Sequence, residues 1–482
     1  MPTQNIGFDN TFMRELAGFY VAQAPAVAPN PKLLQFNQAL ADDLGLEPSV
    51  ADQAAIIFSG AKVPDGASPL AQVYAGHQFG GFSPQLGDGR ALLLGEVIDC
   101  AGARRDIALK GSGWTPFSRG GDGKAAIGPV LREYLVGEAM FAMGIPTSRA
   151  LCAVATGEVV YREAALPGAV LTRVAASHIR VGTFQFFAAR GEWDSVQKLA
   201  DYAIARHYPQ AAAAPNPYLA FFDAVCAVQT RLIAQWMGVG FIHGVMNTDN
   251  MTVSGETIDY GPCAFMESYA PGTVFSSIDQ TGRYAYANQP LILGWNLARL
   301  AETLLPLMDA DEDRAVTIAT ERLKGIAGLY RKAWTGVMRA KLGLLGQDDG
   351  DAELAEGLLA AMSGQNADWT MTFGRLPTAC DGDASLLAPL FDDPAALMEW
   401  LPKWRARLAP DAHARMNRAN PVIIPRNHLV EDALVAATDG DLSPFRALLA
   451  AIKDPFGDVA GREAFASPAP SGFGPYKTFC GT

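Results

Sequence analysis

A lysine and a glutamate lie 23 residues apart, at positions where a strand and a helix are expected. Lys110 lies in the segment 106–112, which follows a glycine-containing turn at 87–90. Glu133 lies in the next apolar segment of helical period. An ammonium group on a strand, held by a carboxylate on the next helix, can present positive charge to phosphates. Either residue alone would be explained more simply as surface charge, and the turn alone is an ordinary hairpin signal.

A second group of polar residues occupies the loop 243–250, which ends in Asp249 and Asn250. Asp259 follows nine residues later in an Asp-Tyr-Gly tripeptide, after short strand-like pieces at 251–253 and 256–258. Carboxylate and amide oxygens suit Mg²⁺ or Mn²⁺, and such an ion neutralises phosphate oxygens. Placed after Lys110 and Glu133, these residues follow the order of the catalytic and metal loops of protein kinases.

One position departs from the kinase pattern. A kinase carries its catalytic aspartate five residues before the metal-binding asparagine, and that position is Val245 here. Valine cannot accept a proton, and the nearest carboxylate in the loop is Asp249. The residues alone therefore leave two alternatives, an inactive protein or an enzyme whose geometry differs from that of an ordinary phosphotransferase.

A third group of residues is basic. Arg173 and Arg180 flank the expected junction between a strand-rich and a helix-rich region, and a glycine-rich loop with Arg119 and Lys124 follows Lys110. Clustered arginines can hold phosphate oxygens through paired hydrogen bonds. Without the two motifs above, these residues would be interpreted as surface charge.

The elements that must position these residues change in type along the chain. Hydrophobic alternation predicts strands at 91–99, 106–112, 151–163 and 169–175, the first two joined by a turn at 100–105, and helical spacing predicts a helix at 129–145. From about residue 193 the pattern is helical, most clearly at 215–240 and 288–307. We therefore predict an α+β, atypical protein-kinase-like fold with a strand-rich and a helical lobe around a cleft.

The chain is long enough for more than one packed unit. The predicted divisions are an N-terminal extension at 1–70, a strand-rich lobe at 71–185, a helical lobe at 186–400, and a C-terminal helical extension with a cysteine-containing tail at 401–482. The tail is expected to be irregular, lying on the surface or reaching back to the cleft.

Composition indicates an ordinary globular protein, with 49% hydrophobic and 18% charged residues. A formal charge of −12 argues against broad nucleic-acid binding, so an anionic ligand would need locally clustered cations. No apolar run reaches membrane-spanning length, and the start lacks the pattern of a secretory signal. Six cysteines without metal-binding spacing fit a reduced cytoplasmic setting. We expect a cytoplasmic monomer that contacts neither membrane nor nucleic acid.

Taken together, the motifs resemble the selenoprotein O family over nearly the whole chain. The resemblance includes Tyr74-Ala75-Gly76-His77-Gln78-Phe79-Gly80, the turn Gly87–Arg90, Lys110–Gly113, Ser118–Gly123, Arg173, Arg180, the 243–250 loop, Asp259–Pro262, Asn420-Pro421, Arg426-Asn427 and the tail with Cys480. The strings at 74–80 and 243–250 are specific to that family.

The resemblance implies a kinase-like enzyme that binds ATP in a flipped orientation and transfers AMP to Ser, Thr or Tyr hydroxyls of proteins, itself included. UMP transfer from UTP with manganese is a related activity in bacterial members. By this resemblance, Asp249 is the catalytic base, Asn250 and Asp259 bind Mg²⁺ or Mn²⁺, and Glu133 braces Lys110. The implied nucleotide contacts are Gly87, Gly89, Arg90, Lys110, Asp122, Gly123, Arg173, Arg180 and Asp259.

The family also pairs a cysteine in the loop after Asp259 with a tail cysteine for redox control. The tail residue Cys480 is present, but the corresponding loop position is Phe275, and Cys263 is a substitute nearer to Asp259. Two other functions stay open beside AMP transfer, namely γ-phosphoryl transfer as an ordinary kinase and a nucleotide-binding pseudokinase scaffold.

Overall fold

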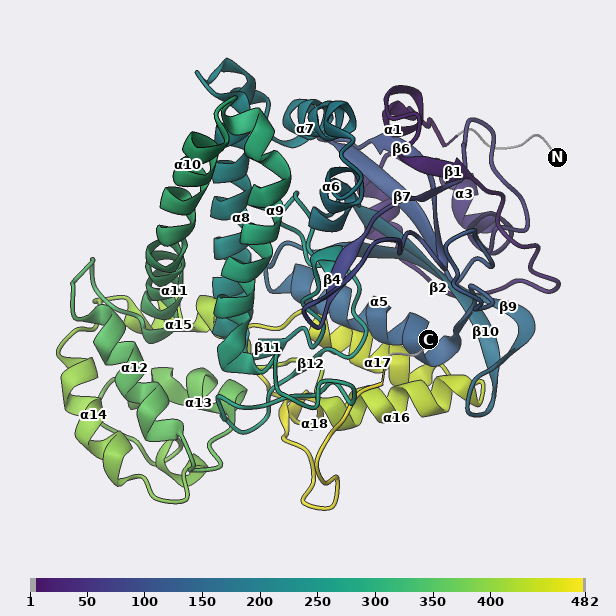
Figure 1. Cartoon of the computed structure of the whole chain (residues 1–482). Helices are drawn as coiled ribbons and strands as arrows, with labels where there is room; N and C mark the ends of the chain where they lie inside the picture. The colour runs from purple at the N-terminus through teal and green to yellow at the C-terminus, as the bar shows by residue number, and fades with distance from the viewer. Residues whose placement is uncertain (1–5, 480–482) are drawn as a thin grey trace.

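The computed structural model describes residues 6–479 and contains a strongly twisted, antiparallel sheet (Figure 1). Its strands are, in spatial order, β1 (Tyr20–Ala22), β3 (Leu70–Gln72), β6 (Ala91–Ile98), β7 (Arg104–Lys110), β10 (Ala165–Ala175), β9 (Arg149–Tyr161) and β2 (Lys32–Phe36), with β8 (Ala125–Ala126) beside β10. The mixture of helix and antiparallel sheet confirms the predicted α+β class. Strands β1 and β2 come from the predicted N-terminal extension and pair with this same sheet.

The strands of the predicted front region are confirmed, as is the hairpin that joins β6 to β7. Strand β6 is buried along nearly its whole length, because both faces of the sheet are covered. On one face, α2 (Gln38–Asp43) and α4 (Ala54–Phe58) pack against apolar residues that include Leu94 and Leu109. On the other face lies α5 (Ile127–Ala142), the predicted helix that carries Glu133.

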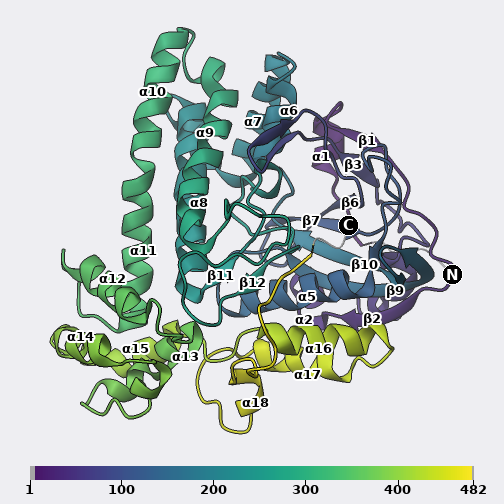
Figure 2. The same ribbon diagram turned by 60° about the horizontal axis from the view of Figure 1, so that its bottom comes forward.

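Helix α5 is itself covered by a late part of the chain. Helices α16 (Asn427–Thr438) and α17 (Ser443–Ile452) pack against it and share its apolar core, with Phe445 against Tyr134. In both views the two yellow helices lie along α5 on the side away from the sheet (Figures 1 and 2). Glu133 is therefore fixed between the sheet and residues some 300 positions further along the chain.

Most of the remaining helices form a helical region beside the sheet (Figure 1). They include α6 (Val181–Ala188), α7 (Trp193–His207), α8 (Pro217–Val239), α9 (Gln289–Met308), α10 (Glu312–Lys324), α11 (Ile326–Leu342), α12 (Asp351–Met362), α13 (Trp369–Arg375), α14 (Ala395–Arg405) and α15 (Ala412–Ala419). Predicted helices at 215–240 and 288–307 are confirmed as α8 and α9. Helix α8 begins where Asn216 accepts a hydrogen bond from Leu219 N–H and ends at Gly240, whose φ of 69° is left-handed.

The strand-like pieces predicted at 251–253 and 256–258 are wrong as strands. Only an isolated bridge links Met251 to Thr257. The segment is held instead by its neighbours, since Thr257 also bridges to Thr147 and Thr252 to Arg180. Nearby, β11 (Phe241–Ile242) pairs with β12 (Ala264–Phe265) and brings both ends of the 243–263 region together.

The C-terminal tail reaches back to the segment that follows Asp259, as one of the two predicted alternatives stated. After α18 (Glu463–Ala466) the yellow chain in Figure 2 runs past α5 toward the sheet. Thr478 pairs with the backbone of Phe275 and Ser277, and its hydroxyl donates to the Pro262 carbonyl at 2.8 Å. None of the helices in the described part of the chain combines the length and apolar character that a membrane crossing requires.

Candidate functional site

A cleft of about 800 Å³ opens between the sheet and the helical region. All residues predicted to act as base, nucleotide contacts or metal ligands line it, namely Gly87, Gly89, Arg90, Lys110, Asp122, Gly123, Arg173, Arg180, Asp249, Asn250 and Asp259. These residues come from the turn before β6, from β7 and the loop after it, from β10 and the segment after it, and from the loops after α8. Residues far apart in the sequence thus line one cavity, as the prediction of a cleft between two lobes required.

Lys110 lies at the back of the cleft between two carboxylates. Its Nζ contacts Glu133 Oε2 on α5 at 2.5 Å and Asp259 Oδ1 at 2.9 Å. The first contact is the predicted strand-to-helix ion pair, and the second joins the sheet to the Asp-Tyr-Gly loop. Because the lysine has partners on both sides, its ammonium is held in one position without a ligand.

Arg173 and Arg180 complete the positive group, and the side chain of each is only 2% exposed. Arg173 Nη1 contacts Asp259 Oδ1 at 2.6 Å, and Arg180 Nη2 contacts Asp259 Oδ2 at 3.3 Å. Burial of two guanidinium groups is costly unless anions face them. Three cations therefore surround one carboxylate, a concentration of positive charge in a chain of net charge −12.

Asp259 stays ionised because of these neighbours. Burial alone would raise its pKa, yet Lys110, Arg173 and Arg180 hold the pKa well below its ordinary value. Its backbone has a φ of 58°, a left-handed conformation unusual for a residue with a side chain. Such strain persists where the surroundings fix the residue, and it directs this carboxylate toward the cations.

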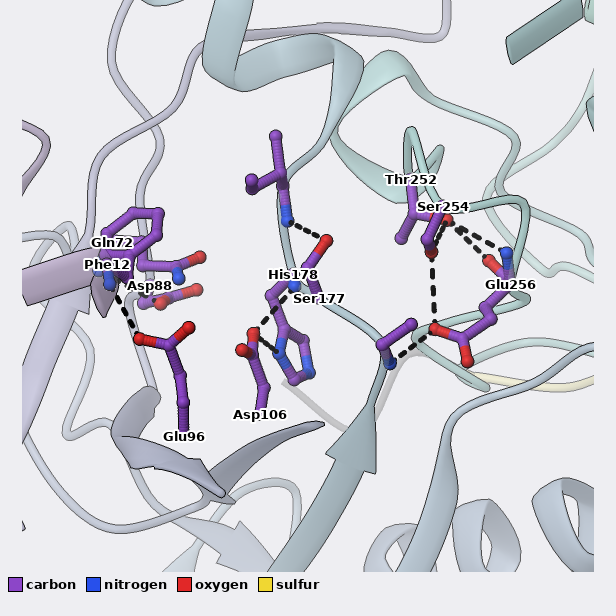
Figure 3. Close-up of polar contacts among 12 residues, drawn as sticks. Phe12, Gln72, Asp88, Glu96, Asp106, Ser177, His178, Thr252, Ser254 and Glu256 are labelled. Carbon is purple, nitrogen blue, oxygen red and sulfur yellow. Dashed lines mark hydrogen bonds and ion pairs between the residues drawn. The ribbon is translucent and has the colours of Figure 1, made fainter. Parts of the chain in front are cut away.

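The segment that carries Arg180 is anchored by buried polar groups (Figure 3). His178 Nδ1 and its backbone N–H both contact Asp106 Oδ2 at 2.9 Å. Glu256 accepts a hydrogen bond from Ala176 N–H at 2.8 Å. These contacts tie the connection between β10 and α6 to β7 and to the loop before Asp259, so that Arg180 enters the cleft from a rigid base.

Asp249 and Asn250 lie in the short helical turn Thr248–Asn250, which also lines the cleft. Asp249 is 8% exposed, and burial raises its pKa to about 6. Its Oδ2 accepts from Gln78 Nε2 at 3.2 Å, while Oδ1 has no hydrogen-bond partner among residues 6–479. A carboxylate with a raised pKa and spare acceptor capacity is suited to take a proton from a hydroxyl near neutral pH. Val245, at the kinase base position, also lines the cleft.

Asn250 and Asp259 fit a hard divalent cation by their chemistry. Asn250 Nδ2 donates to the Val245 carbonyl at 3.0 Å, which leaves its Oδ1 as the oxygen available to a cation. No group of three His, Cys, Asp or Glu side chains with metal-binding geometry occurs in residues 6–479. An ion held by these two oxygens would therefore need phosphate oxygens or water to complete its shell, as Mg²⁺ commonly does.

The glycine-rich loops shape the outer part of the cleft. Gly87 has a φ of 74°, and a Cβ there would clash with the Phe117 ring. A Cβ on Gly123, whose φ is 68°, would clash with the backbone at Gly113. Asp122 pairs with Arg162 at 2.9 Å, which lowers the pKa of its carboxyl. These backbones lie too close for side chains, an arrangement that lets main-chain groups approach a ligand.

Several residues of the site were missed by the sequence analysis. Asp88 contacts Arg180 Nη1 at 3.2 Å, and its other oxygen accepts from Gln72 N–H at 3.0 Å. Tyr74 lies 4.2 Å beneath the Arg180 guanidinium. Asp88 was treated as part of a turn and Tyr74 as part of a motif, because only the fold brings them to an arginine some 100 residues later.

The redox prediction stays untested. Cys263 is a buried free thiol, and burial raises its pKa to about 12. Cys480 lies outside the described residues. The backbone pairing of Thr478 with the segment at 275–277 does bring the described end of the tail beside the predicted loop position.

A cleft with three clustered cations, a strained aspartate and a nearby proton acceptor is typical of enzymes that bind nucleoside triphosphates. The family model described as Protein adenylyltransferase SelO matches residues 2–453. The chain therefore belongs to the protein adenylyltransferase SelO family.

Curated relatives agree with this assignment. The chain is 66% identical over 478 residues to Protein nucleotidyltransferase YdiU of Cereibacter sphaeroides (strain KD131), which covers 98% of this chain and 99% of the relative. It is 58% identical over 485 residues to the protein of that name from Rhizobium johnstonii, with 98% and 97% covered. For the protein of that name from Rhizobium meliloti the identity is 56% over 485 residues, with 98% and 99% covered.

Proposed function

We propose that this chain transfers AMP from ATP to the hydroxyl groups of Ser, Thr or Tyr in proteins, itself included, and UMP from UTP as a related reaction. The observation that carries this proposal is the set of charged side chains that line the cleft. Three cations lie around Asp259, while the carboxylate of Asp249 lines the same cleft with an oxygen that has no hydrogen bond in the described chain. The cations suit a polyphosphate, and the Asp249 carboxylate suits an acceptor hydroxyl.

In this proposal the two-lobed arrangement is kinase-like, with the sheet and α5 as one lobe and the helical region as the other. The divisions near residues 70, 185 and 400 belong to the same proposal. Support comes from the Lys110–Glu133 pair between β7 and α5 and from the order of the two loops after α8. A mainly antiparallel sheet beside helices is compatible with this interpretation.

The cations would hold the outer phosphates. Lys110, Arg173 and Arg180 already form a rigid group, so little reorganisation is required when phosphate oxygens replace Asp259 as partners. Asn250 and Asp259 would hold Mg²⁺ or Mn²⁺. When bound, that ion would neutralise phosphate oxygens and help to orient the nucleotide.

We infer the flipped orientation from the separate roles of the cations and the base. With the outer phosphates on the buried cations, the α-phosphate is left to face Asp249. Asp249 takes the proton of the acceptor hydroxyl as the hydroxyl oxygen bonds to the α-phosphorus, and the bond from that phosphorus to the pyrophosphate oxygen breaks. The products are an AMP–protein phosphodiester and pyrophosphate. Val245 takes no part, since the proton acceptor lies elsewhere.

Labelled nucleotides distinguish this proposal from its alternatives. The protein is incubated with ATP labelled at the α or the γ position, in Mg²⁺ or Mn²⁺, with itself and a mixed protein pool as acceptors. Label from the α position on protein, with pyrophosphate released, supports AMP transfer. Label from the γ position alone would instead indicate an ordinary kinase, and no label despite ATP binding would indicate a pseudokinase. Heat-denatured protein serves as the control for non-enzymatic labelling.

A further inference from the structure

A small hairpin beside the cleft lies outside the eight-stranded sheet. Strand β4 (Gly76–Gln78) pairs with β5 (Gly81–Ser83), and the turn consists of Phe79 and Gly80 with φ values of 51° and 89°. Two successive left-handed residues form the tight turn that suits a two-residue hairpin. A phenylalanine is strained in this conformation, so other contacts must hold it there.

Three of those contacts go to the loop that carries Asp249. Three successive hairpin residues each donate a hydrogen bond to one of three successive loop residues. His77 N–H donates to Thr248 Oγ1 at 2.7 Å, Gln78 Nε2 donates to Asp249 Oδ2 at 3.2 Å, and Phe79 N–H donates to Asn247 Oδ1 at 3.1 Å. The loop is therefore tied to the hairpin through its side chains, which accept hydrogen bonds from all three hairpin residues.

Other side chains make the junction tight. Tyr284 OH donates to Asn247 Oδ1 at 2.6 Å, and its ring packs on Phe79 at 5.0 Å between centroids. Gln185 links the two sides, since it contacts His77 Nδ1 at 2.9 Å and accepts from Thr248 Oγ1 at 2.6 Å. Every polar side chain of the loop from Asn247 to Asp249 thus has a partner fixed to the hairpin or beside it.

The Asp249 carboxylate is confined on two sides by this hairpin. A Cβ on Gly76 would overlap Asp249 Oδ1, so only glycine leaves room for the carboxylate in its present position. Gln78 supplies the hydrogen bond to Asp249 Oδ2. The close backbone of Gly76 and the hydrogen bond from the Gln78 amide both restrict rotation of the Asp249 carboxylate about its Cβ–Cγ bond.

We propose that Gln78 is a positioning residue for the transfer reaction, acting through Asp249, and that the β4–β5 hairpin holds this base in line with the acceptor hydroxyl. This inference rests on the proposed function, because it assigns Asp249 as the base. Gln78 need not contact the nucleotide phosphates, whose cationic partners lie around Asp259. A proton acceptor must lie within hydrogen-bonding reach of the hydroxyl, and misplacement by about 1 Å can cost on the order of 100-fold in rate.

The test is a double-mutant cycle on single-turnover AMP transfer. Gln78→Met keeps the length of the side chain without the amide donor, and we expect kcat to fall roughly 10- to 100-fold while the affinity for ATP is unchanged. In an Asp249→Asn background the same substitution should cause no further loss, since its effect passes through the carboxylate. A purely structural role would lower the rate equally in both backgrounds.

A matched control exists on the surface. Gln38 Nε2 donates to Asp42 Oδ1 at 2.8 Å on the exposed face of α2, so Gln38→Met removes the same kind of contact away from the cleft and should leave transfer unchanged. Gln78→Asn is the second variant, because it retains the amide but is one methylene too short to reach Asp249. If the Gln78→Met variant does not fold, the rate of the Gln78→Asn variant alone tests the positioning role.

The outcomes separate this inference from the proposed function. If the unaltered chain transfers no α-label, the proposed function fails. If the unaltered chain transfers AMP while Gln78→Met and Gln78→Asn keep full kcat, the positioning role is wrong and the proposed function stands. A loss that is additive with Asp249→Asn also overturns the positioning role.

Discussion

Replacement of Asp259 by alanine tests the electrostatics of the cleft most directly. The carboxylate contacts Lys110 at 2.9 Å, Arg173 at 2.6 Å and Arg180 at 3.3 Å, so its removal leaves three cations close together. Each cation keeps one partner, because Lys110 and Arg173 still contact Glu133 and Arg180 still contacts Asp88. Loss of one partner from a buried ion-pair network typically costs about 3–5 kcal/mol.

We therefore expect the Asp259→Ala variant to unfold at a lower urea concentration, with a free energy of unfolding reduced by about 3 kcal/mol, the lower end of that range because each cation retains one partner. Added ATP without metal should restore part of this loss, since its phosphates supply the missing negative charge. AMP transfer should be abolished, because a metal ligand is missing.

The assays are urea denaturation with and without ATP and α-label transfer in Mg²⁺ or Mn²⁺. Asp122→Ala offers a comparison, because that carboxylate is more exposed and pairs with a single arginine at the outer loop. Stability equal to that of the unaltered chain would refute the argument that Asp259 offsets three cations. Retention of full transfer would refute its assignment as a metal ligand.

Three further predictions concern other buried charges. Lys110→Ala should weaken ATP binding in calorimetry, and unchanged affinity would remove Lys110 from the site. Arg426→Met should lower the free energy of unfolding by about 3–5 kcal/mol in urea titration, since it leaves Asp368 and Glu267 facing each other without the buried guanidinium; a change within about 0.5 kcal/mol would contradict this. Burial lowers the pKa of Lys341 to about 7. Between pH 7 and 10 the unfolded chain therefore binds more protons there, and this lysine makes stability rise with pH by at most about 1.4 kcal/mol per unit. Lys341→Met should remove that slope, and identical slopes in both proteins would count against it.

Much of the fold could be predicted because the local patterns agree with the tertiary structure. The β6–β7 hairpin has alternating or continuous apolar residues on both sides of a turn, and the sheet is covered on both faces. Helices α5, α8 and α9 have clear apolar spacing and definite ends. The pieces at 251–253 and 256–258 failed as strands, because the bridge between Met251 and Thr257 is isolated and other bridges tie the pieces to Thr147 and Arg180.

Some residues of the candidate site could likewise be predicted from the sequence, and others could not. Lys110, Glu133, Asp249 and Asp259 could be selected because their chemistry and order are informative in sequence. The contribution of Asp88 could not be predicted, because its contact with Arg180 spans 92 positions and an aspartate between glycines is an ordinary turn residue. The partner of Asp249 could not be predicted either, because Gln78 meets it across 171 positions through a hairpin outside the main sheet.

The packing of α16 and α17 against α5 has a consequence for folding during synthesis. Lys110 and Glu133 are synthesised early, but the apolar residues of α16 and α17 that pack against α5 are not available until residues 427–452 have left the ribosome. A nascent or prematurely ended chain thus has every group needed at the back of the cleft and lacks the support that aligns them. Competence to bind nucleotide should arise late in synthesis, when nearly the whole polypeptide is complete.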